Sequence, residues 1–335
     1  MPGVEKLQHF KHTTPLVFPS AIMRFISLNL SLSEGMTALE LRLPLLDYAL
    51  THRDSERKQM FRKNRLLSLV EQKRIPLGIQ MFTGSAAIIE VLGQTGYDFV
   101  MIDTEHSQVN PRALEEMIRT AELAGLIPYV RVTDLLTEVE TRQALEAGGE
   151  GLFLPRVKSV ADIRRVADFA FFPPKGRRHV CPEVRAANYN TPSYDQYIEW
   201  NNAEVTLIPI IEMPEAVEDI DAICAHPDVK MLYFAPGNLA VQLGLGMKGM
   251  RSPQVQAASR KVLDAVAHHG LLMVGGPLLA TPESCKKAFD DGIRIFSLGV
   301  DTMGFRSFCE QTVAAVNEAV TGTAFTRPPA PPSGL

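Results

Sequence analysis

The sequence predicts a (β/α)8 TIM barrel. Eight short apolar segments alternate with helical segments between residues 77 and 320, which is the order of a parallel α/β fold. Polar and charged residues collect directly after these segments, where a barrel carries its chemistry. The alternative is an open doubly wound sheet. We disfavour it because neither G-x-G-x-x-G nor G-x-x-x-x-G-K-[ST] follows the first apolar segment.

The predicted strands are apolar runs bounded by turn residues. They span residues 77–82, 98–102, 127–132, 151–155, 205–211, 230–235, 271–276 and 294–300. The intervening segments 111–125, 137–149 and 159–171 carry apolar residues at helical spacing. One connection, residues 171–204, is much longer than the others, and we interpret it as a lid or an interface element.

The barrel is assigned to residues 61–320. Residues 1–60 lack a sustained period and are predicted to be an N-terminal extension that is disordered or peripheral. Residues 321–335 include the Pro-rich stretch "TRPPAPPSGL" and are predicted to be a disordered tail.

Composition excludes several classes of function. The net charge of −4 gives no basic excess for nucleic acid or an anionic membrane surface, and no apolar run is long enough to span a bilayer. The four cysteines form no C-x-x-C pair, which argues against a zinc site or a disulfide framework. We therefore expect a cytoplasmic enzyme or binding protein with a small-molecule partner.

One rim of the predicted barrel gathers most of the unusual polar side chains. The stretch "YDFVMIDTEHS" ends the second predicted strand in two acids and an imidazole. Similar residues follow the next four strands. The set is Asp103, Glu105 and His106 after the second strand, then Arg131, Arg156, Glu212 and Asn238 after the third to the sixth.

Each of these residues also has a structural interpretation. Glu212 could favour the positive end of a following helix, and Asn238 could be an N-cap. Arg131 could be an ion-pair partner, and His106 a hydrogen-bonded loop residue. Their collection on one rim favours a functional site, without naming its reaction.

Several segments together resemble the HpcH/HpaI aldolase family over residues 63–320. They occur in the family's order and spacing, and they read "GYDFVMIDTEHS", "YVRV", "LEAGGEGLFLPRV", "FPPKGRR", "IIEMPEAVEDIDAI", "YFAPGNLA" and "FSLGVDT". The resemblance implies a metal-assisted carbon–carbon lyase acting on 2-oxo acids, with Mg²⁺ as the expected ion and Mn²⁺ or Co²⁺ as alternatives. It also implies a homohexamer, a trimer of dimers, in which the last helix is exchanged between subunits.

The same resemblance assigns catalytic roles. His106 matches the family's base, with Glu146 as the acid that would hold it. Arg131 matches the arginine that binds the ketone oxygen and stabilises the enolate. Asp103 and Glu105 match acids that order water at the metal. A guanidinium and a divalent cation suit this chemistry because both spread the negative charge of an enolate.

Binding roles follow in the same way. Glu212 matches the first metal ligand, and Asn238 stands at the position of the second. The backbone of Ala235, Pro236 and Gly237 matches the loop that receives the substrate carboxylate. Arg156, together with Arg178 and Tyr197 from the long connection, is expected to contact substrate.

The sequence departs from the family's pattern at Asn238 and at Ile210. Asn238 replaces an aspartate, and because an amide carries no charge the metal affinity should fall by about one or more powers of ten. Ile210 stands where the family has a glutamine.

Three hypotheses follow. The favoured one is a working lyase with a weaker metal site and a bulkier or less polar substrate. The second is a diverged decarboxylase, dehydratase or ring-forming enzyme in which Arg131, Arg156 and His106 act with little or no metal. The third is a non-catalytic scaffold.

Overall fold

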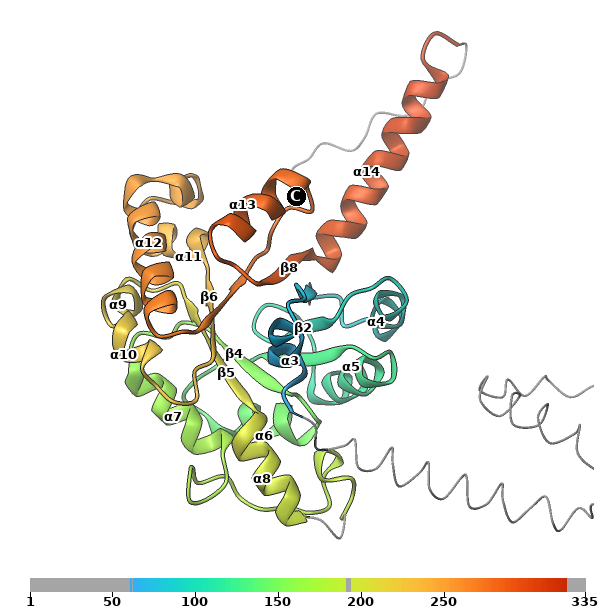
Figure 1. Cartoon of the computed structure of the whole chain (residues 1–335). Helices are drawn as coiled ribbons and strands as arrows, with labels where there is room; N and C mark the ends of the chain where they lie inside the picture. The colour runs from blue at the N-terminus through green and yellow to red at the C-terminus, as the bar shows by residue number, and fades with distance from the viewer. Residues whose placement is uncertain (1–60, 62, 191–193, 324–335) are drawn as a thin grey trace, which may run out of the picture. The chain divides into compact units, whose positions relative to one another are not determined.

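The computed structural model describes residues 61, 63–190 and 194–323, and it shows a closed barrel of eight parallel strands (Figure 1). The predicted TIM barrel is therefore confirmed. The predicted extension at residues 1–60 and nearly all of the predicted tail lie outside the described residues, so both assignments stay predictions.

The strands follow one another around the barrel in chain order. They are β1 (Leu77–Met81), β2 (Phe99–Asp103), β3 (Ile127–Arg131), β4 (Gly151–Leu154), β5 (Thr206–Ile211), β6 (Met231–Phe234), β7 (Leu272–Gly275) and β8 (Ile295–Val300). Each predicted strand boundary lies within one residue of the observed one. The agreement reflects the buried, continuously apolar strands of parallel sheets, which turn residues delimit clearly.

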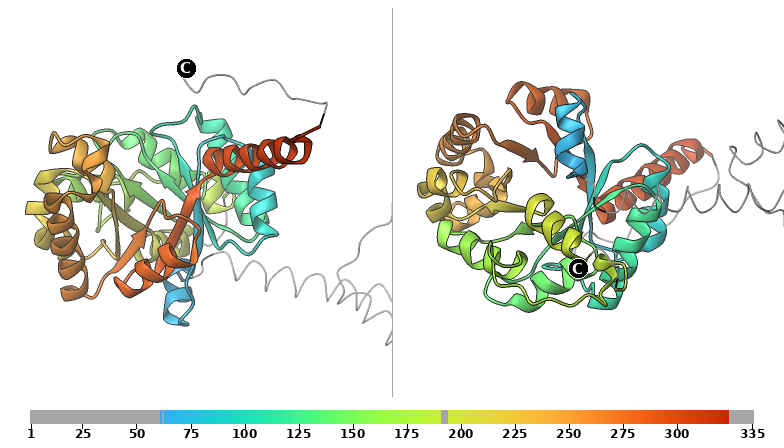
Figure 2. Two further views of the ribbon diagram at one scale, coloured as in Figure 1. Left: turned by 90° about the horizontal axis from the view of Figure 1, so that it is seen from above. Right: turned by 60° about the horizontal axis from the view of Figure 1, so that its bottom comes forward.

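Helices surround the barrel (Figure 2). They are α3 (Arg65–Glu71), α4 (Ala86–Gly93), α5 (Pro111–Leu123), α6 (Glu138–Glu146), α7 (Val160–Ala170), α8 (Tyr194–Glu204), α9 (Pro214–Glu218), α10 (Ile220–Cys224), α11 (Pro236–Gln242), α12 (Pro253–His268), α13 (Pro282–Asp290) and α14 (Asp301–Val320). Two short 3₁₀ turns, η1 (Arg185–Ala187) and η2 (Met247–Arg251), complete the described part.

The core has two layers because successive side chains of a strand point to opposite faces. One layer, including Val100, Ile102 and Leu152, lies between the strands and the helices. The other fills the barrel interior with a ladder of edge-to-face aromatic rings. Its ring centroids are 6.3 Å apart for Phe99 and Tyr129, 6.0 Å for Tyr129 and Phe153, and 5.9 Å for Phe153 and Tyr233.

Helix α3 closes the amino-terminal end of the barrel. Leu66 is fully buried in the interior layer. Asn64 caps the helix by accepting from the Leu67 N–H at 3.0 Å, and its own amide donates to the Tyr129 hydroxyl at 3.2 Å. The opposite, carboxyl-terminal end is therefore the one open to a substrate.

The long connection between β4 and β5 does not cover that open end. The Arg185 guanidinium donates to the Ala147 carbonyl at 2.7 Å, and the Asn201 amide donates to the Ala170 carbonyl at 3.0 Å. Both acceptors lie at the carboxyl ends of helices, where the chain returns to the start of a strand. The expectation of a lid over this rim is therefore wrong, because the connection packs at the amino-terminal end.

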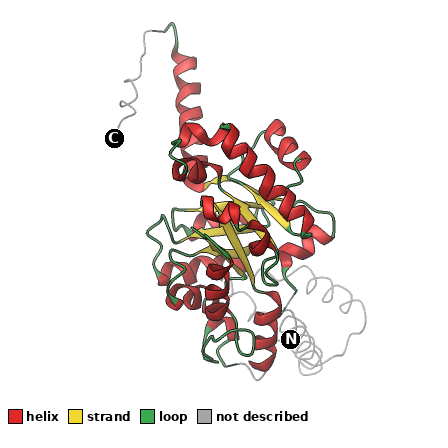
Figure 3. Cartoon of the chain, turned by 90° about the vertical axis from the view of Figure 1, so that its left-hand side faces the viewer, coloured by secondary structure: helices red, strands yellow, loops and turns green. Residues whose placement is uncertain are grey.

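Helix α14 extends away from the barrel (Figures 1 and 3). Every residue from Thr302 to Ala319 is exposed, including Phe305 and Phe308. The helix is fixed at its start by the buried Asp301, whose carboxylate accepts from the backbone N–H groups of Phe82 and Thr83 at 3.0 Å each. No helix among the described residues is both long and apolar enough to cross a membrane.

Candidate active site

Asp103 organises the rim of β2 and β3. It is fully buried at the end of β2 and is paired in register with Arg131 of β3. One carboxylate oxygen accepts from the Arg131 guanidinium, and the other accepts from the His106 N–H at 2.6 Å. A single buried acid thus fixes both a cation and the loop that carries the imidazole.

Arg131 is held from several sides. Besides the bond to Asp103, its Nη1 lies 3.5 Å from Glu105 Oε2, and its Cζ lies 5.7 Å from the centre of the Phe82 ring. The residue is only 8% exposed. Charge-assisted bonds of this kind give a guanidinium a fixed direction, which catalysis by positioned charge requires.

Glu105 lies among three cationic or basic side chains. Its Oε2 is 3.5 Å from His106 Nε2 as well as from Arg131 Nη1, and its Oε1 is 3.4 Å from Arg156 Nε. Burial raises the pKa of Glu105 above its ordinary value, Arg131 and then His106 oppose this shift, and Glu212 reinforces it. Glu105 is therefore the acid that faces the imidazole.

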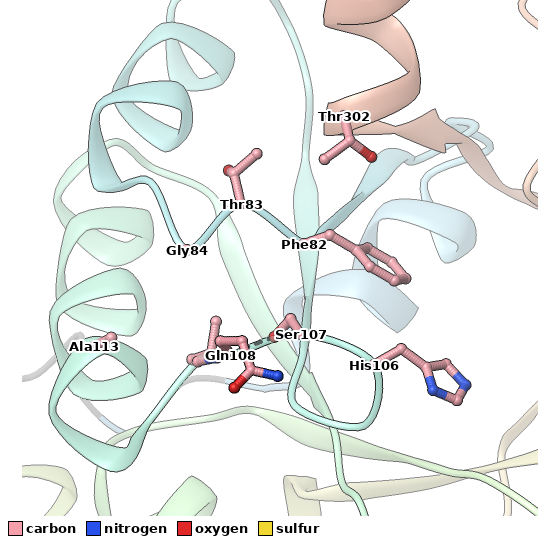
Figure 4. A pocket seen from close by; sticks show the side chains of 9 residues that line it. Phe82, Thr83, Gly84, His106, Ser107, Gln108, Ala113 and Thr302 are labelled. Atoms are coloured by element: carbon pink, nitrogen blue, oxygen red, sulfur yellow. Dashed lines mark hydrogen bonds between the residues drawn. The ribbon is translucent and has the colours of Figure 1, made fainter. Parts of the chain in front are cut away.

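His106 stands at the open mouth with 56% of its side chain exposed. Figure 4 shows its ring and that of Phe82 pointing to the same side, away from Ala113 at the start of α5. Beside them is a cavity of about 480 Å³ lined mainly by residues of the loops after β1 and β2 and by Thr302 of α14. A base at this position can reach a molecule that enters from solvent.

Glu212 and Asn238 meet across the mouth. Glu212 is 3% exposed; its Oε1 accepts from the Arg156 N–H at 2.7 Å, and its Oε2 accepts from the Asn238 amide at 2.5 Å. Arg156 has a φ of 54°, a left-handed conformation that is uncommon for a residue other than glycine. The strand ends thus bring together the two residues predicted as metal ligands.

The predicted carboxylate loop begins α11. Ala235 is its N-cap, followed by Pro236 and Gly237, and the Ala235 N–H donates to the Ile211 carbonyl at 3.1 Å. The first N–H groups of a helix have no acceptor within it, so they are available to an anion. A Cβ on Gly237 would lie 3.1 Å from Met247 Cε, so the methionine side chain would have to shift to admit a larger residue.

The floor of the site contains residues that the sequence reasoning missed. The Gln80 amide donates to the Tyr233 hydroxyl at 2.9 Å, and both residues are buried. Burial raises the pKa of Tyr233, and the opposing influence of Arg131 places it near the site. Polar residues at inward positions of β1 and β6 were the available signal. Ile210 lies in the interior layer on β5, two residues before Glu212, which follows the strand.

A sequence model of the HpcH/HpaI aldolase/citrate lyase family matches residues 79–307, most of the barrel described above. The chain belongs to this family. Its members are named as lyases, and the chain is accordingly an enzyme of the carbon–carbon lyase type.

Individual relatives agree with this membership. A hydroxypyruvate/pyruvate aldolase of Paraburkholderia phytofirmans is 29% identical over 246 residues, 72% of this chain and 92% of the relative. Among solved structures, an HpcH/HpaI aldolase/citrate lyase family protein from Burkholderia cenocepacia has a TM-score of 0.70 at 26% identity, covering 76% of this chain and 99% of that one. Macrophomate synthase has a TM-score of 0.68 at 26% identity, covering 78% and 89%.

Within one chain, the structure does not bring together Glu146 and His106, which the family resemblance pairs. Glu146 is the last residue of α6 and pairs with Arg142 at 3.2 Å. The loop after it returns to the start of β3, where the Glu150 N–H donates to the Pro128 carbonyl at 2.9 Å. His106 follows the other end of the neighbouring strand, so Glu146 does not contact the His106 of its own chain, where Glu105 lies 3.5 Å from the ring. The role of Glu146 as the acid that holds the base stays a prediction.

Arg178 and Tyr197 are likewise not at the rim. The Arg178 guanidinium donates to Asn201 at 2.8 Å and to the Tyr197 hydroxyl at 3.2 Å, and it lies 4.7 Å from the centre of the Phe172 ring. Both residues are buried in a small cluster of the long connection, at the amino-terminal end. They do not reach the rim of their own barrel, and the expectation that they contact substrate stays a prediction.

The metal expected for the HpcH/HpaI family fits these residues poorly. Of the two implied ligands, Asn238 is neutral and turns its NH₂ group to Glu212. The remaining acids of the rim, Asp103 and Glu105, are engaged by arginines. Hard divalent cations favour several oxygen ligands and anionic charge, which this set does not offer.

Proposed function

We propose that the protein makes or breaks the carbon–carbon bond between a 2-oxo acid of the pyruvate or oxaloacetate type and a carbonyl acceptor. The observation that carries this proposal is the Asp103–Arg131–Glu105–His106 group at one mouth of the barrel. It supplies a fixed cation where an enolate oxygen would form, and a base paired with an acid beside it.

Each residue of the site has a separate role in the cleavage reaction. Arg131 donates to the ketone oxygen and stabilises the negative charge that develops there. The first N–H groups of α11, around Gly237, receive the substrate carboxylate. His106 removes the hydroxyl proton of the aldol, and Glu105, 3.5 Å away, stabilises the imidazolium that results. In the direction of condensation the same groups act in reverse.

The cavity beside His106 would take the acceptor part of the substrate. Its lining combines the apolar side chains of Phe82 and Val109 with the hydroxyl groups of three residues. These are Thr83, Ser107 and Thr302 (Figure 4). This mixture supports an acceptor that is bulkier or less polar than a short carboxylated aldehyde.

The resemblance to the family implies Mg²⁺ at Glu212 and Asn238, with Mn²⁺ or Co²⁺ as alternatives. If bound, such an ion would polarise the substrate ketone. Because the donor set fits it poorly, the steps above are assigned to the protein's own side chains alone.

The experiment that tests the function is hydrogen exchange at pyruvate C3 in D₂O, followed by NMR. Formation of the enolate replaces the methyl protons by deuterium, and we expect exchange well above the rate without enzyme. Folded protein that shows no exchange with or without added Mg²⁺ would contradict the proposal.

The second candidate is a different reaction that passes through the same enolate. Asn238 and Arg156 alter the charge on the side of the site that faces Arg131, which supports it. Loss of CO₂ from oxaloacetate would give the same enolate without an aldol. The likeness to macrophomate synthase supports keeping this candidate. Oxaloacetate consumption with evolution of CO₂, in the absence of aldol cleavage, would favour it over the first.

We further propose a cytoplasmic homohexamer, a trimer of dimers, in which α14 is exchanged between subunits. The exposed apolar residues of this helix support the exchange. They include Met303, Phe305, Phe308, Val313 and Val316.

A further inference from the structure

We propose that Arg156 takes the part of a divalent cation in this site, so that the enolate forms between two guanidinium groups, those of Arg156 and Arg131, without a metal ion. The inference rests on the proposed function, because it specifies how that reaction's negative charge is stabilised.

The Glu212 carboxylate is already occupied by hydrogen bonds. Both of its oxygens already accept hydrogen bonds from this chain, one from the Arg156 N–H at 2.7 Å and one from the Asn238 amide at 2.5 Å. An ion bound between Glu212 and Asn238 would require the amide to turn its oxygen toward the carboxylate and to give up its own bond. The neutral amide then returns less attraction to the ion than a second carboxylate would.

Arg156 places a positive charge beside the acids of the rim. Its backbone nitrogen is bound to Glu212, while its charged side chain has Nε 3.4 Å from Glu105 Oε1. The Arg156 guanidinium also donates to the Thr133 carbonyl. A divalent cation at Glu212 would add to the positive charge that Arg156 and Arg131 already bring to this rim.

The backbone of Arg156 has an unusual conformation. The φ of 54° is unfavourable for a residue with a Cβ, and the rim keeps it. Residues held in such conformations cluster at functional sites. Here the conformation satisfies the Glu212 carboxylate through the main chain, so the guanidinium is not needed for that bond and lies at the mouth beside Glu105, where 57% of the side chain is exposed.

The chemistry balances without another reagent. His106 takes the hydroxyl proton, the acceptor carbonyl forms, and the electron pair of the broken carbon–carbon bond moves into the enolate. The enolate oxygen becomes negative and accepts hydrogen bonds from Arg131 and Arg156. The proton returns to C3 to give the 2-oxo acid. Guanidinium groups suit this role because they stay charged and offer several donors in one plane.

The test uses the full chain after removal of metal with EDTA. We expect calorimetry with Mn²⁺ to give no saturable binding below millimolar concentration, and pyruvate C3 exchange to continue in EDTA. The matched variant Asn238→Asp restores a second carboxylate and should tighten Mn²⁺ binding by about tenfold or more. Sub-millimolar binding of Mn²⁺ to the unaltered chain, or loss of its exchange in EDTA, would overturn the inference.

Variants of Arg156 test its part in the reaction. Arg156→Gly keeps the backbone N–H and suits a positive φ, so it removes the guanidinium with little cost to the fold. We expect it to slow exchange in EDTA by about 100-fold, with Arg156→Lys recovering part of the loss. Unchanged exchange in Arg156→Gly would overturn the role of Arg156. Exchange only with added metal would defeat the inference but keep the proposed function, whereas no exchange in any condition would defeat both.

Discussion

At the scale of single residues, the site depends on carboxylates that position other groups. Asp103 has no exposed surface and contacts Arg131 and the backbone of His106, so it orients the groups that touch substrate. Glu105 is the acid that faces the base. Their position directly after the second predicted strand placed these residues on the rim, and the structure adds which of them touch one another.

Replacing Asp103 by Asn should be strongly destabilising. The amide keeps the shape but leaves the buried Arg131 charge without its closest partner, and breaking a buried ion pair costs about 3 kcal/mol or more. Urea unfolding followed by circular dichroism measures this loss. Asp290→Asn breaks the exposed pair with Lys286 and should change the free energy of unfolding little. Equal effects in the two variants would contradict the assigned role.

His106→Ala and Arg131→Ala should each slow pyruvate C3 exchange by about 100-fold or more, because one removes the base and the other the cation at the enolate oxygen. Thermal unfolding checks that each variant is folded. His179→Ala changes an exposed histidine of the long connection and should leave the rate unchanged. Either catalytic variant retaining full exchange would remove that residue from the mechanism.

Glu105 should make the stability of the protein depend on pH. Burial raises its pKa from the ordinary value of 4.5, so the folded chain holds this proton more tightly than the unfolded chain. Stability should therefore fall as pH rises from the ordinary value through the raised one. Glu105→Gln removes this titratable group. As pH rises across that range, the unfolding free energy of the parent should fall relative to that of the variant. A constant difference would show that burial does not govern Glu105.

At the scale of elements, the sequence predicted the barrel well because its strands are short apolar runs between turn residues. It also placed Asp103, Arg131 and Glu212 correctly, since the carboxyl ends of parallel strands meet on one rim. The motif around Glu146 gives order along the chain and not the end of the barrel, so it did not show that Glu146 lies away from the His106 of its own chain. A residue that ends a helix lies at the amino-terminal side, as α6 shows.

The long connection gives a test of that distinction. Tyr197→Phe removes the hydroxyl that accepts from Arg178, a loss of about 1 kcal/mol in unfolding free energy. Because this pair lies away from the rim, kcat and KM of the folded enzyme should not change. Chemical denaturation and steady-state kinetics on the same sample check both statements. A raised KM at unchanged stability would bring Tyr197 back to the substrate.

At the scale of the whole molecule, the closed barrel leaves its sheet without edges, and the described surface has one conspicuous exposed element, α14. Phe305 and Phe308 are 67% and 64% exposed on this helix, with ring centroids 6.4 Å apart. Apolar exposure of this kind marks an interaction surface.

Changing both phenylalanines to serine should lower the mass of the assembly measured by light scattering, from a hexamer to dimers or single chains. Ser307→Ala, between them on the same exposed helix, is the matched control and should leave the mass unchanged. A parent protein that is already a single chain would contradict the proposed exchange.

The carboxylate of Asp301 gives this helix a second importance. It stands at the first residue of α14, yet it holds the backbone of Phe82, whose ring faces Arg131. Two contacts thus connect the exposed helix α14 with the Arg131 guanidinium. If neighbouring chains fix α14, dilution below the dissociation constant of the assembly should loosen the Phe82 loop and lower the turnover of each chain. The turnover of each chain would then depend on the protein concentration through assembly.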